Sequence, residues 1–276
     1  MRASSSNQNG FTVVEVIVVV TVLSLLTGIV LQTLGGFFND NISSLGKAAQ
    51  DTQTRGVLRQ IVRELSNTNG FMTDITSLSQ PLGRNDQTTW SYLGNISSQP
   101  FYDSAQKTNR VLIATSTATD KANSDPTRLP IFINAGLGCD PSLSPIALNA
   151  LVFFVAKNPT TGKYDLYRRT ITNVTGGTLC SNISQQQTCS PAAVSSYATI
   201  CKGVDANLLR NIDSFTVDYF TSPNDALPIS NQYGGTPAVK SNIQAAKAIK
   251  ITVTTNDFID GKYVQNSASI RASLNY

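Results

Sequence analysis

Residues 9–34 read NGFTVVEVIVVVTVLSLLTGIVLQTL, and this stretch decides how the rest of the chain is built. From Phe11 to Leu34 it is apolar apart from Glu15, Gln32 and several Thr, Ser and Gly residues. A helix of about 20 apolar residues, rising about 1.5 Å per residue, crosses the hydrocarbon core of a bilayer. The stretch therefore predicts a membrane-spanning helix. It is too long for the apolar part of a secretory signal, and no A-x-A site follows it.

The flanking charges predict the orientation of this helix. Arg2 lies before it, and no Lys or Arg follows until Lys47. Positive charge stays on the cytoplasmic side of a span. We therefore expect a single-pass protein of the cytoplasmic membrane with its N-terminus in the cytoplasm and the remaining chain outside.

Glu15 is the unusual residue of the span. A carboxylate near the bilayer centre costs on the order of 2.5–3.5 kcal/mol, and less toward the end of a helix. One interpretation is that Glu15 reaches back to the cytoplasmic interface and has no further role. The other is that the bond after Gly10 is cut, so that Phe11 carries a free α-amine that pairs with Glu15 of a neighbouring, axially shifted helix. Because leaving either charge unpaired in low dielectric is costly, such a pair would set the register between helices.

The motif Gly10-Phe11-Thr12-x-x-Glu15, a polar leader before it and an apolar run after it resemble the type III signal of type IV prepilins. The resemblance implies that a membrane-embedded prepilin peptidase cuts after Gly10 and N-methylates Phe11. It also implies that Glu15 guides assembly with other pilin subunits.

The composition of the 276 residues argues against several other functions. The net charge is +4, with no block of Lys and Arg that would indicate nucleic-acid binding. There is no histidine, which removes the commonest general base and the commonest metal ligand. No Gly-rich phosphate loop is present. We therefore expect no enzyme activity, no cofactor and no metal.

The cysteines lie in the C-terminal half, at Cys139, Cys180, Cys189 and Cys201. An even number in an exported domain indicates disulfides, and four cysteines allow three pairings. We favour a staple around the polar stretch at 181–200. Zinc is the alternative, although the chain has neither a CxxC pair nor a histidine.

The helix is expected to continue beyond the membrane to about residue 66. Leu58, Ile61, Val62 and Leu65 form an apolar stripe at helical spacing. On another face there is a row of arginines, which is either solvated or contacts an acidic surface of a neighbouring subunit: Arg55, Arg59 and Arg63. We expect the helix to bend or melt locally at Gly28 and at Gly35-Gly36. The sequence NTNG at 67–70 predicts the end of the helix, with Gly70 as its terminator.

The rest of the chain is predicted to be β-rich. Alternating patterns indicate strands at 111–115, 150–156, 164–171, 215–220, 248–255 and 263–273. NPTTG and Asp260-Gly261 are turn signals, while 72–109, 116–148 and 172–210 look like loops or insertions. The prediction is an α+β fold, pilin-like, with a long N-terminal helix packed on an antiparallel sheet. We divide it into a leader at 1–10, a transmembrane and assembly helix at 11–35, its amphipathic continuation at 36–66 and a head at 67–276.

A second resemblance concerns the subtype. Arg59-x-x-Val62-Arg63-Glu64-Leu65 resembles the helix end of PilW-like minor pilins and of the J-type minor pseudopilins of type II secretion. Residues 248–253 and 270–275 resemble late strands of the same group. The resemblance implies a minor subunit of a type IV pilus-like filament or of its tip or initiation complex, with assembly platform proteins as partners. The alternative is a signal-anchored surface domain that binds a ligand, as an adhesin or DNA-uptake receptor, without polymerising.

Other candidate sites have plainer interpretations. Asp257-x-x-Asp260-Gly261 is either a calcium loop or, as we favour, a hairpin turn. Trp90 and Tyr92 offer either an aromatic ligand surface or, as we favour, core packing. Asp103 and Asp165 have no partner visible in the sequence. Three further aspartates lie in predicted loops and could form a site only if the fold brings them together: Asp120, Asp125 and Asp140.

Overall fold

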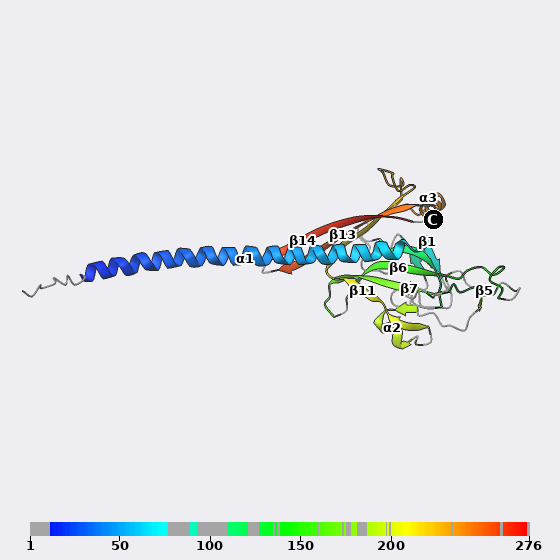
Figure 1. The fold of residues 1–276 in the computed structure, drawn as a ribbon, viewed down its shortest axis with the longest axis horizontal. Helices are drawn as coiled ribbons and strands as arrows, with labels where there is room; N and C mark the ends of the chain where they lie inside the picture. The colour runs from blue at the N-terminus through cyan, green and yellow to red at the C-terminus, as the bar shows by residue number, and fades with distance from the viewer. Residues whose placement is uncertain are drawn as a thin grey trace, which may run out of the picture.

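The computed structural model describes a long helix with a β-rich head around its C-terminal half (Figure 1). The described residues are 12–76, 89–92, 110–120, 127, 129–134, 136, 139–158, 160–172, 174, 178–180, 187–196, 198, 200–232, 234–259 and 262–274. The α+β prediction is confirmed: one long N-terminal helix is packed against antiparallel sheets.

Helix α1 runs without interruption from Val13 to Leu65, 53 residues. The predicted helix from about 12 to 66 is therefore confirmed, but the expected bend or melting at its glycines is wrong, since Gly28, Gly35 and Gly36 all lie inside α1. Glycine costs only about 1 kcal/mol relative to alanine in a helix, and the apolar residues on either side sustain the hydrogen-bond ladder.

The helix ends at the predicted place, but Gly70 is not its terminator. Ser66 caps the C-terminal end of α1, and its N–H bonds to the carbonyl of Val62. Gly70 instead lies in strand β1 (Thr68–Phe71), which pairs with β4 (Leu112–Thr117). The chain thus turns from helix to strand within two residues, and Gly70 serves the strand.

The head contains two main sheets where one was predicted. The larger has the order β1-β4-β6-β7-β11, and each neighbouring pair is antiparallel. Its remaining strands are β6 (Leu148–Lys157), β7 (Tyr164–Ile171) and β11 (Ala206–Leu209). The smaller is antiparallel, with the order β12 (Ile212–Phe220), β13 (Ala248–Ile259) and β14 (Lys262–Ser273).

The stretches predicted as loops also contain short elements. These are β2 (Asp74–Thr76), β3 (Thr89–Ser91), β5 (Ile133–Asn134), β8 (Thr178–Leu179), β9 (Gln187–Cys189), α2 (Pro191–Ser196) and β10 (Cys201–Val204). Strands this short show no measurable period in the sequence, so the alternation of apolar residues does not reveal them. A further helix, α3 (Pro237–Gln244), was not predicted either.

The end of α1 is buried between the two sheets. Leu58, Ile61 and Leu65 are at most 1% exposed, and they belong to one core cluster with residues of both sheets, among them Phe153 and Phe215. The opposite face of the five-stranded sheet has its own core, built around Ile113, Val152, Phe154 and Trp90. Strand β6 is consequently buried on both faces, which explains its continuous apolar run.

Strands β13 and β14 extend beyond the sheet. Pairing of β12 with β13 begins at Ile212 and Thr255, but β13 and β14 continue to pair as far as Ile259 and Lys262. Residues 256–259 and 262–265 therefore form a two-stranded extension, which we call the ribbon. It points along α1 toward the N-terminal half of the helix (Figure 1). The predicted turn residues Asp260 and Gly261 lie outside the described residues.

Candidate functional site

The first turn of α1 is closed by a reciprocal pair of hydrogen bonds. The Thr12 hydroxyl accepts from the Glu15 N–H at 3.3 Å, and the Glu15 carboxylate accepts from the Thr12 N–H at 2.9 Å. The Thr12 hydroxyl also donates to the carboxylate at 3.0 Å. This capping box satisfies backbone donors that the first turn leaves open. It holds the Glu15 carboxylate at the N-terminal tip of the helix.

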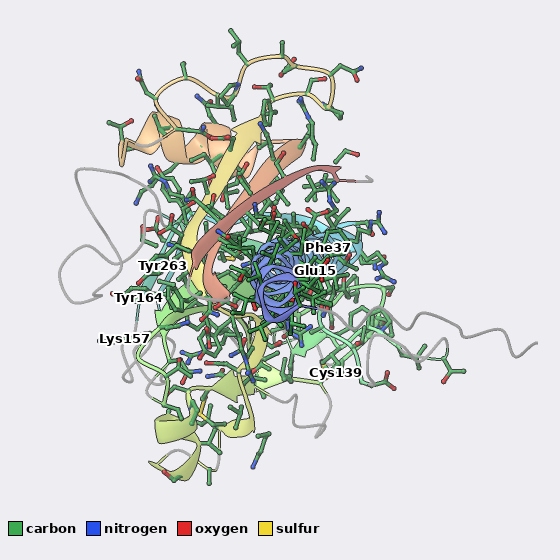
Figure 2. All side chains as sticks on the ribbon, turned by 90° about the vertical axis from the view of Figure 1, so that its left-hand side faces the viewer. Glu15, Phe37, Cys139, Lys157, Tyr164 and Tyr263 are labelled. Atoms are coloured by element: carbon green, nitrogen blue, oxygen red, sulfur yellow. A yellow bond between two sulfur atoms is a disulfide. The ribbon has the colours of Figure 1, made fainter. Side chains whose placement is uncertain are left out.

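After Glu15, the next charged residue of the helix is Asp40. The large apolar side chains from Val13 to Leu34 are 46–76% exposed, since the described part of the head does not cover them. Figure 2 looks along α1 from this end, with Glu15 and Phe37 on the helix and the head behind. Within the described part of the chain, α1 is the helix long and apolar enough to cross a membrane.

The hydroxyls within this segment are satisfied by the helix itself. Each donates to the carbonyl four residues earlier, at 2.6–3.0 Å: Thr21, Ser24, Thr27 and Thr33. In hydrocarbon an unsatisfied polar group costs several kcal/mol, so these bonds make the segment compatible with lipid. Glu15 is then the single ionisable group between Val13 and Asn39.

The uncovered apolar helix with one capped glutamate is the feature that can be compared with known proteins. Residues 5–31 match the prokaryotic N-terminal methylation motif. No curated protein and no solved structure matches the chain. The methylation motif together with the long apolar helix is consistent with a type IV pilin-like protein. Gly10 and Phe11, the residues expected to be processed, lie inside the methylation motif but outside the described residues.

Glu64 connects the far end of α1 to the head. Its Oε1 accepts from Arg168 Nη1 on β7 at 2.7 Å and from Gln60 Nε2 at 3.2 Å. The arginine row behaves differently, because all three of its members are exposed, and Arg55 pairs with Asp51 on the same helix. Exposure in a single chain fits both interpretations of the row, solvation and contact with a neighbouring subunit, and both stay open.

All four cysteines are paired, which removes the zinc alternative. Cys139 bonds to Cys180 and Cys189 to Cys201, with Cα atoms 5.4 and 5.6 Å apart. The second bridge lies within the predicted polar stretch, whereas Cys180 pairs outside it. Among the described residues no group of His, Cys, Asp and Glu could hold a metal ion.

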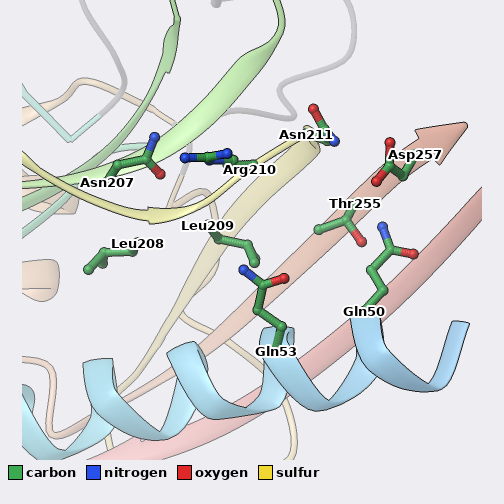
Figure 3. A pocket seen from close by; sticks show the side chains of 9 residues that line it. All are labelled: Gln50, Gln53, Asn207, Leu208, Leu209, Arg210, Asn211, Thr255 and Asp257. Atoms are coloured by element: carbon green, nitrogen blue, oxygen red, sulfur yellow. The ribbon is translucent and has the colours of Figure 1, made fainter. Parts of the chain in front are cut away.

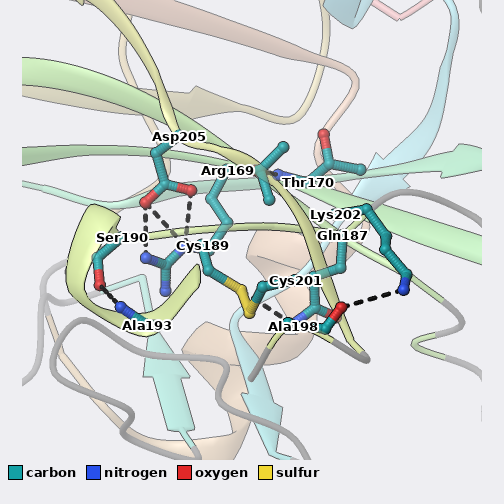
Figure 4. Close-up of a disulfide and its surroundings, with 11 residues drawn as sticks. Arg169, Thr170, Gln187, Cys189, Ser190, Ala193, Ala198, Cys201, Lys202 and Asp205 are labelled. Carbon is teal, nitrogen blue, oxygen red and sulfur yellow. Dashed lines mark hydrogen bonds and ion pairs between the residues drawn. A yellow bond between two sulfur atoms is a disulfide. The ribbon is translucent and has the colours of Figure 1, made fainter. Parts of the chain in front are cut away.

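The Cys189–Cys201 bridge joins β9 to β10 next to a buried ion pair that the sequence did not reveal (Figure 4). Arg169 Nη2 lies 2.6 Å from Asp205 Oδ2, and both side chains are at most 4% exposed. Arg169 Nε also donates to Asp205 Oδ1 at 3.0 Å. The Asp205 N–H in turn bonds to the Cys189 carbonyl at 2.9 Å. The bridge and the ion pair together fix the segment from β9 to β10 on β7.

The aromatic and acidic candidates have structural roles. Trp90 and Tyr92 are 1% and 2% exposed, which confirms core packing. Asp165, whose partner was not visible in the sequence, accepts from Asn158, Asn207 and the Asn211 N–H. Its partners come from other turns of the fold, which local sequence does not show.

The remaining aspartates within the described residues also stabilise turns. Asp120 accepts from the Leu129 N–H, and Asp140 accepts from Ser142. The hydrogen bonds from the Ser142 hydroxyl and N–H lower the pKa of Asp140. Asp257 lies in β13, opposite Val264, and its carboxylate pairs with Lys163 of the β6–β7 turn at 3.5 Å. Asp103 and Asp125 lie outside the described residues.

A polar cavity of about 530 Å³ lies where α1 leaves the head (Figure 3). It is lined from three directions, by α1, by β11 with its connection to β12, and by β13: Gln50, Gln53, Asn207, Leu208, Leu209, Arg210, Asn211, Thr255 and Asp257. The lining contains four amide side chains, one Arg and one Asp, and the described residues place no histidine or cysteine in it. The cavity marks the level on α1 at which β13 passes the helix.

Proposed function

We propose that this chain is made as a prepilin, cut after Gly10, N-methylated at Phe11 and assembled as a minor pilin or pseudopilin. It would first be held in the cytoplasmic membrane by residues 11–35 and then enter a type IV pilus-like filament or its tip or initiation complex. The observation that carries this proposal is the methylation motif at 5–31. It lies on a helix whose apolar N-terminal half is exposed and is not packed against the described part of the head.

The exposed apolar half of α1 is suited to exchange between two apolar surroundings. Moving it from lipid into a bundle of like helices keeps its apolar surface away from water, so little hydrophobic free energy is lost. Glu15 supplies the specific contact: in a bundle, its carboxylate accepts the Phe11 amine of a neighbour and fixes the stagger between subunits. The capping box supports this role, because it already places the carboxylate at the helix tip.

The size of the head and the additional elements outside its two main sheets favour a minor subunit. Beyond the two sheets it carries two disulfides, α2, α3 and several two- or three-residue strands. A bulky head is accommodated more easily at a tip than at every repeat of a fibre. The partners would be other pilin or pseudopilin subunits, the prepilin peptidase and membrane-embedded assembly platform proteins.

The experiment that tests the proposal is the mass and identity of the N-terminal residue in membrane fractions, with and without the prepilin peptidase. A chain that begins at N-methyl-Phe11 only when the peptidase is present is the expected result. A chain that begins at Met1 or Arg2 in both strains would overturn the proposal. It would leave the alternative of an anchored domain that binds a surface or DNA ligand without polymerising.

A further inference from the structure

The ribbon at the end of β13 and β14 exposes two aromatic side chains. Phe258 is 56% exposed and Tyr263 is 79% exposed. They are cross-strand partners, with ring centroids 5.0 Å apart in an edge-to-face arrangement. The pair contributes to the ribbon by up to about 1 kcal/mol, but most of its aromatic surface still faces outward. Large exposed apolar groups that gather at one place usually mark an interaction site.

A second hairpin end lies beside the ribbon. Lys163, in the turn between β6 and β7, contacts Asp257 of the ribbon at 3.5 Å. The same hairpin presents Tyr164, 37% exposed, and the exposed Lys157. Figure 2 shows Tyr263, Tyr164 and Lys157 on one side of α1, on the face of the head that looks toward the N-terminal half of the helix. We call these five residues the lower aromatic face: Lys157, Lys163, Tyr164, Phe258 and Tyr263.

The level of this face along α1 follows from the fold. Thr255 and Gln50 line the same cavity, so β13 passes the helix near Gln50. The four ribbon residues that follow Thr255 extend about 14 Å at roughly 3.4 Å per residue. On a helix rising about 1.5 Å per residue, that is about nine residues. The end of the ribbon is therefore level with about residue 41, one turn beyond Phe37 and Phe38.

The apolar run of α1 ends at the same place. Within α1, Phe37 and Phe38 are the aromatic residues that close it, both at least 60% exposed, and Asp40 is the first charge after Glu15. A run of this length, from Val13 to Phe38, spans a bilayer with its end at the outer headgroup layer. The end of the ribbon then lies within a few ångströms of that layer, and the contact between Lys163 and Asp257 lies about 7 Å further out, at roughly 3.4 Å per ribbon residue.

We propose that the lower aromatic face rests in the headgroup layer of the bilayer that holds α1, and so fixes the head against the outer surface of the membrane. This inference rests on the membrane anchoring in the proposed function, but not on polymerisation. Tyrosine and other aromatic side chains concentrate at the membrane–water interface, where an apolar ring and a polar edge are both satisfied. Lysines at this depth extend their ammonium groups toward headgroup phosphates.

The position of the face favours the bilayer over a second copy of the chain as its occupant. Lys157, Tyr164 and Tyr263 lie on the face of the head that looks along the emerging apolar helix, which is the side on which a single anchored copy meets lipid. Leu227 provides a comparison: it is 80% exposed, but lies in the connection from β12 to α3, at the other end of the three-stranded sheet. If any exposed apolar side chain associated with lipid, Leu227 and the ribbon would contact lipid equally. The proposal instead predicts contact at the ribbon and none at Leu227.

The test uses the full chain in lipid nanodiscs that contain a fraction of lipid with a nitroxide on its headgroup. Because the four native cysteines are all in disulfides, a single introduced cysteine carries the fluorescent label. One sample is labelled at Asn256→Cys on the ribbon and the other at Leu227→Cys. We expect nitroxide quenching at least twofold stronger at position 256 than at 227. Phe258→Ser combined with Tyr263→Ser should lower the quenching at 256 to the level of 227, whereas the matched control Leu227→Ser should leave it unchanged.

Four results would overturn the inference. Equal quenching at 256 and 227, or quenching at 256 that survives the double substitution, would mean that the face does not contact headgroups. Energy transfer between labels that rises with the number of chains per disc, and is lost in the double variant, would identify a second copy as the occupant. Failure of α1 to insert, detected by alkaline extraction of the same samples, would overturn the anchoring itself. The N-terminal mass measurement reports separately on processing.

Discussion

Oε1 of Glu64 accepts a hydrogen bond from Nη1 of Arg168 at 2.7 Å, and this pair joins the last turn of α1 to the five-stranded sheet. Glu64 belongs to the Arg-Glu-Leu group on which the resemblance to minor pilins rests, and the neighbouring Leu65 is fully buried. The group thus has a clear structural role, because the carboxylate and the leucine hold the helix in the head.

Arg168→Met should destabilise the head. It leaves Glu64 partly buried with only Gln60 as a hydrogen-bond partner for Oε1, and Oε2 already lacks a partner among the described residues. Loss of a hydrogen bond between charged groups costs about 1.5–3 kcal/mol. Urea unfolding of the full chain in detergent measures this loss. Arg59→Met on the exposed face of α1 is the control, expected to change stability by less than about 0.5 kcal/mol. Equal losses for the two variants would contradict the role of the pair.

Asp205→Asn should cost more, about 3–5 kcal/mol, because it leaves the Arg169 charge buried without its carboxylate. Replacing both residues, as Arg169→Met with Asp205→Leu, should recover most of the loss, since an apolar pair of similar volume avoids desolvation. A double-mutant cycle from urea unfolding measures the coupling. A double variant as unstable as Asp205→Asn alone would show that the pair does not act as a unit.

Tyr219→Phe should be neutral or stabilising at pH 7 and should remove a loss of stability at high pH. The Tyr219 hydroxyl is buried and has no hydrogen-bond partner among the described residues. Burial, followed by the proximity of Tyr92, raises the pKa of Tyr219 well above that of free tyrosine, near 10. Above about pH 10 the unfolded chain releases a proton that the folded chain keeps, so the free energy of unfolding falls as pH rises.

Unfolding free energies between pH 8 and 11 check this prediction. Tyr92→Phe is the matched control, because the Tyr92 hydroxyl donates to the Gly234 carbonyl. It should lose about 1 kcal/mol already at pH 7. If Tyr219→Phe lost as much at pH 7, its hydroxyl would have an unrecognised partner.

Glu15→Gln should leave membrane insertion intact and reduce entry into filaments at least tenfold. A tenfold change in incorporation corresponds to about 1.4 kcal/mol. A carboxylate in hydrocarbon costs more than this, and in the filament the pairing of Glu15 with the Phe11 amine would offset that cost. The ratio of sheared-filament to membrane signal on immunoblots measures it. Gln32→Leu, which changes the polarity of the same span without removing a charge, is the control. Equal incorporation of both variants would favour the interpretation that Glu15 merely reaches the interface.

The elements predicted from sequence are those whose signals are local. The apolar run predicts the N-terminal half of α1, and NPTTG predicts the β6–β7 hairpin. Helix α3 also carries a local signal, Thr236 before Pro237, although the helix was not predicted. Features that depend on long-range contacts could not be predicted from the sequence. These are the division into two sheets, the disulfide pairing and the Arg169–Asp205 pair, because each depends on residues that become neighbours only when the chain has folded.

Because α1 continues unbroken from Val13 to Leu65, it acts as a stiff lever arm. Transmembrane helices tilt by about 20° on average. The helix turns packed in the head lie roughly 50 Å from the middle of the span at about 1.5 Å per residue, so such a tilt displaces the head sideways by about 17 Å. With no hinge at Gly35 or Gly36, the head cannot move independently of the span. A change in bilayer thickness alters the tilt of the span and would therefore displace the head sideways.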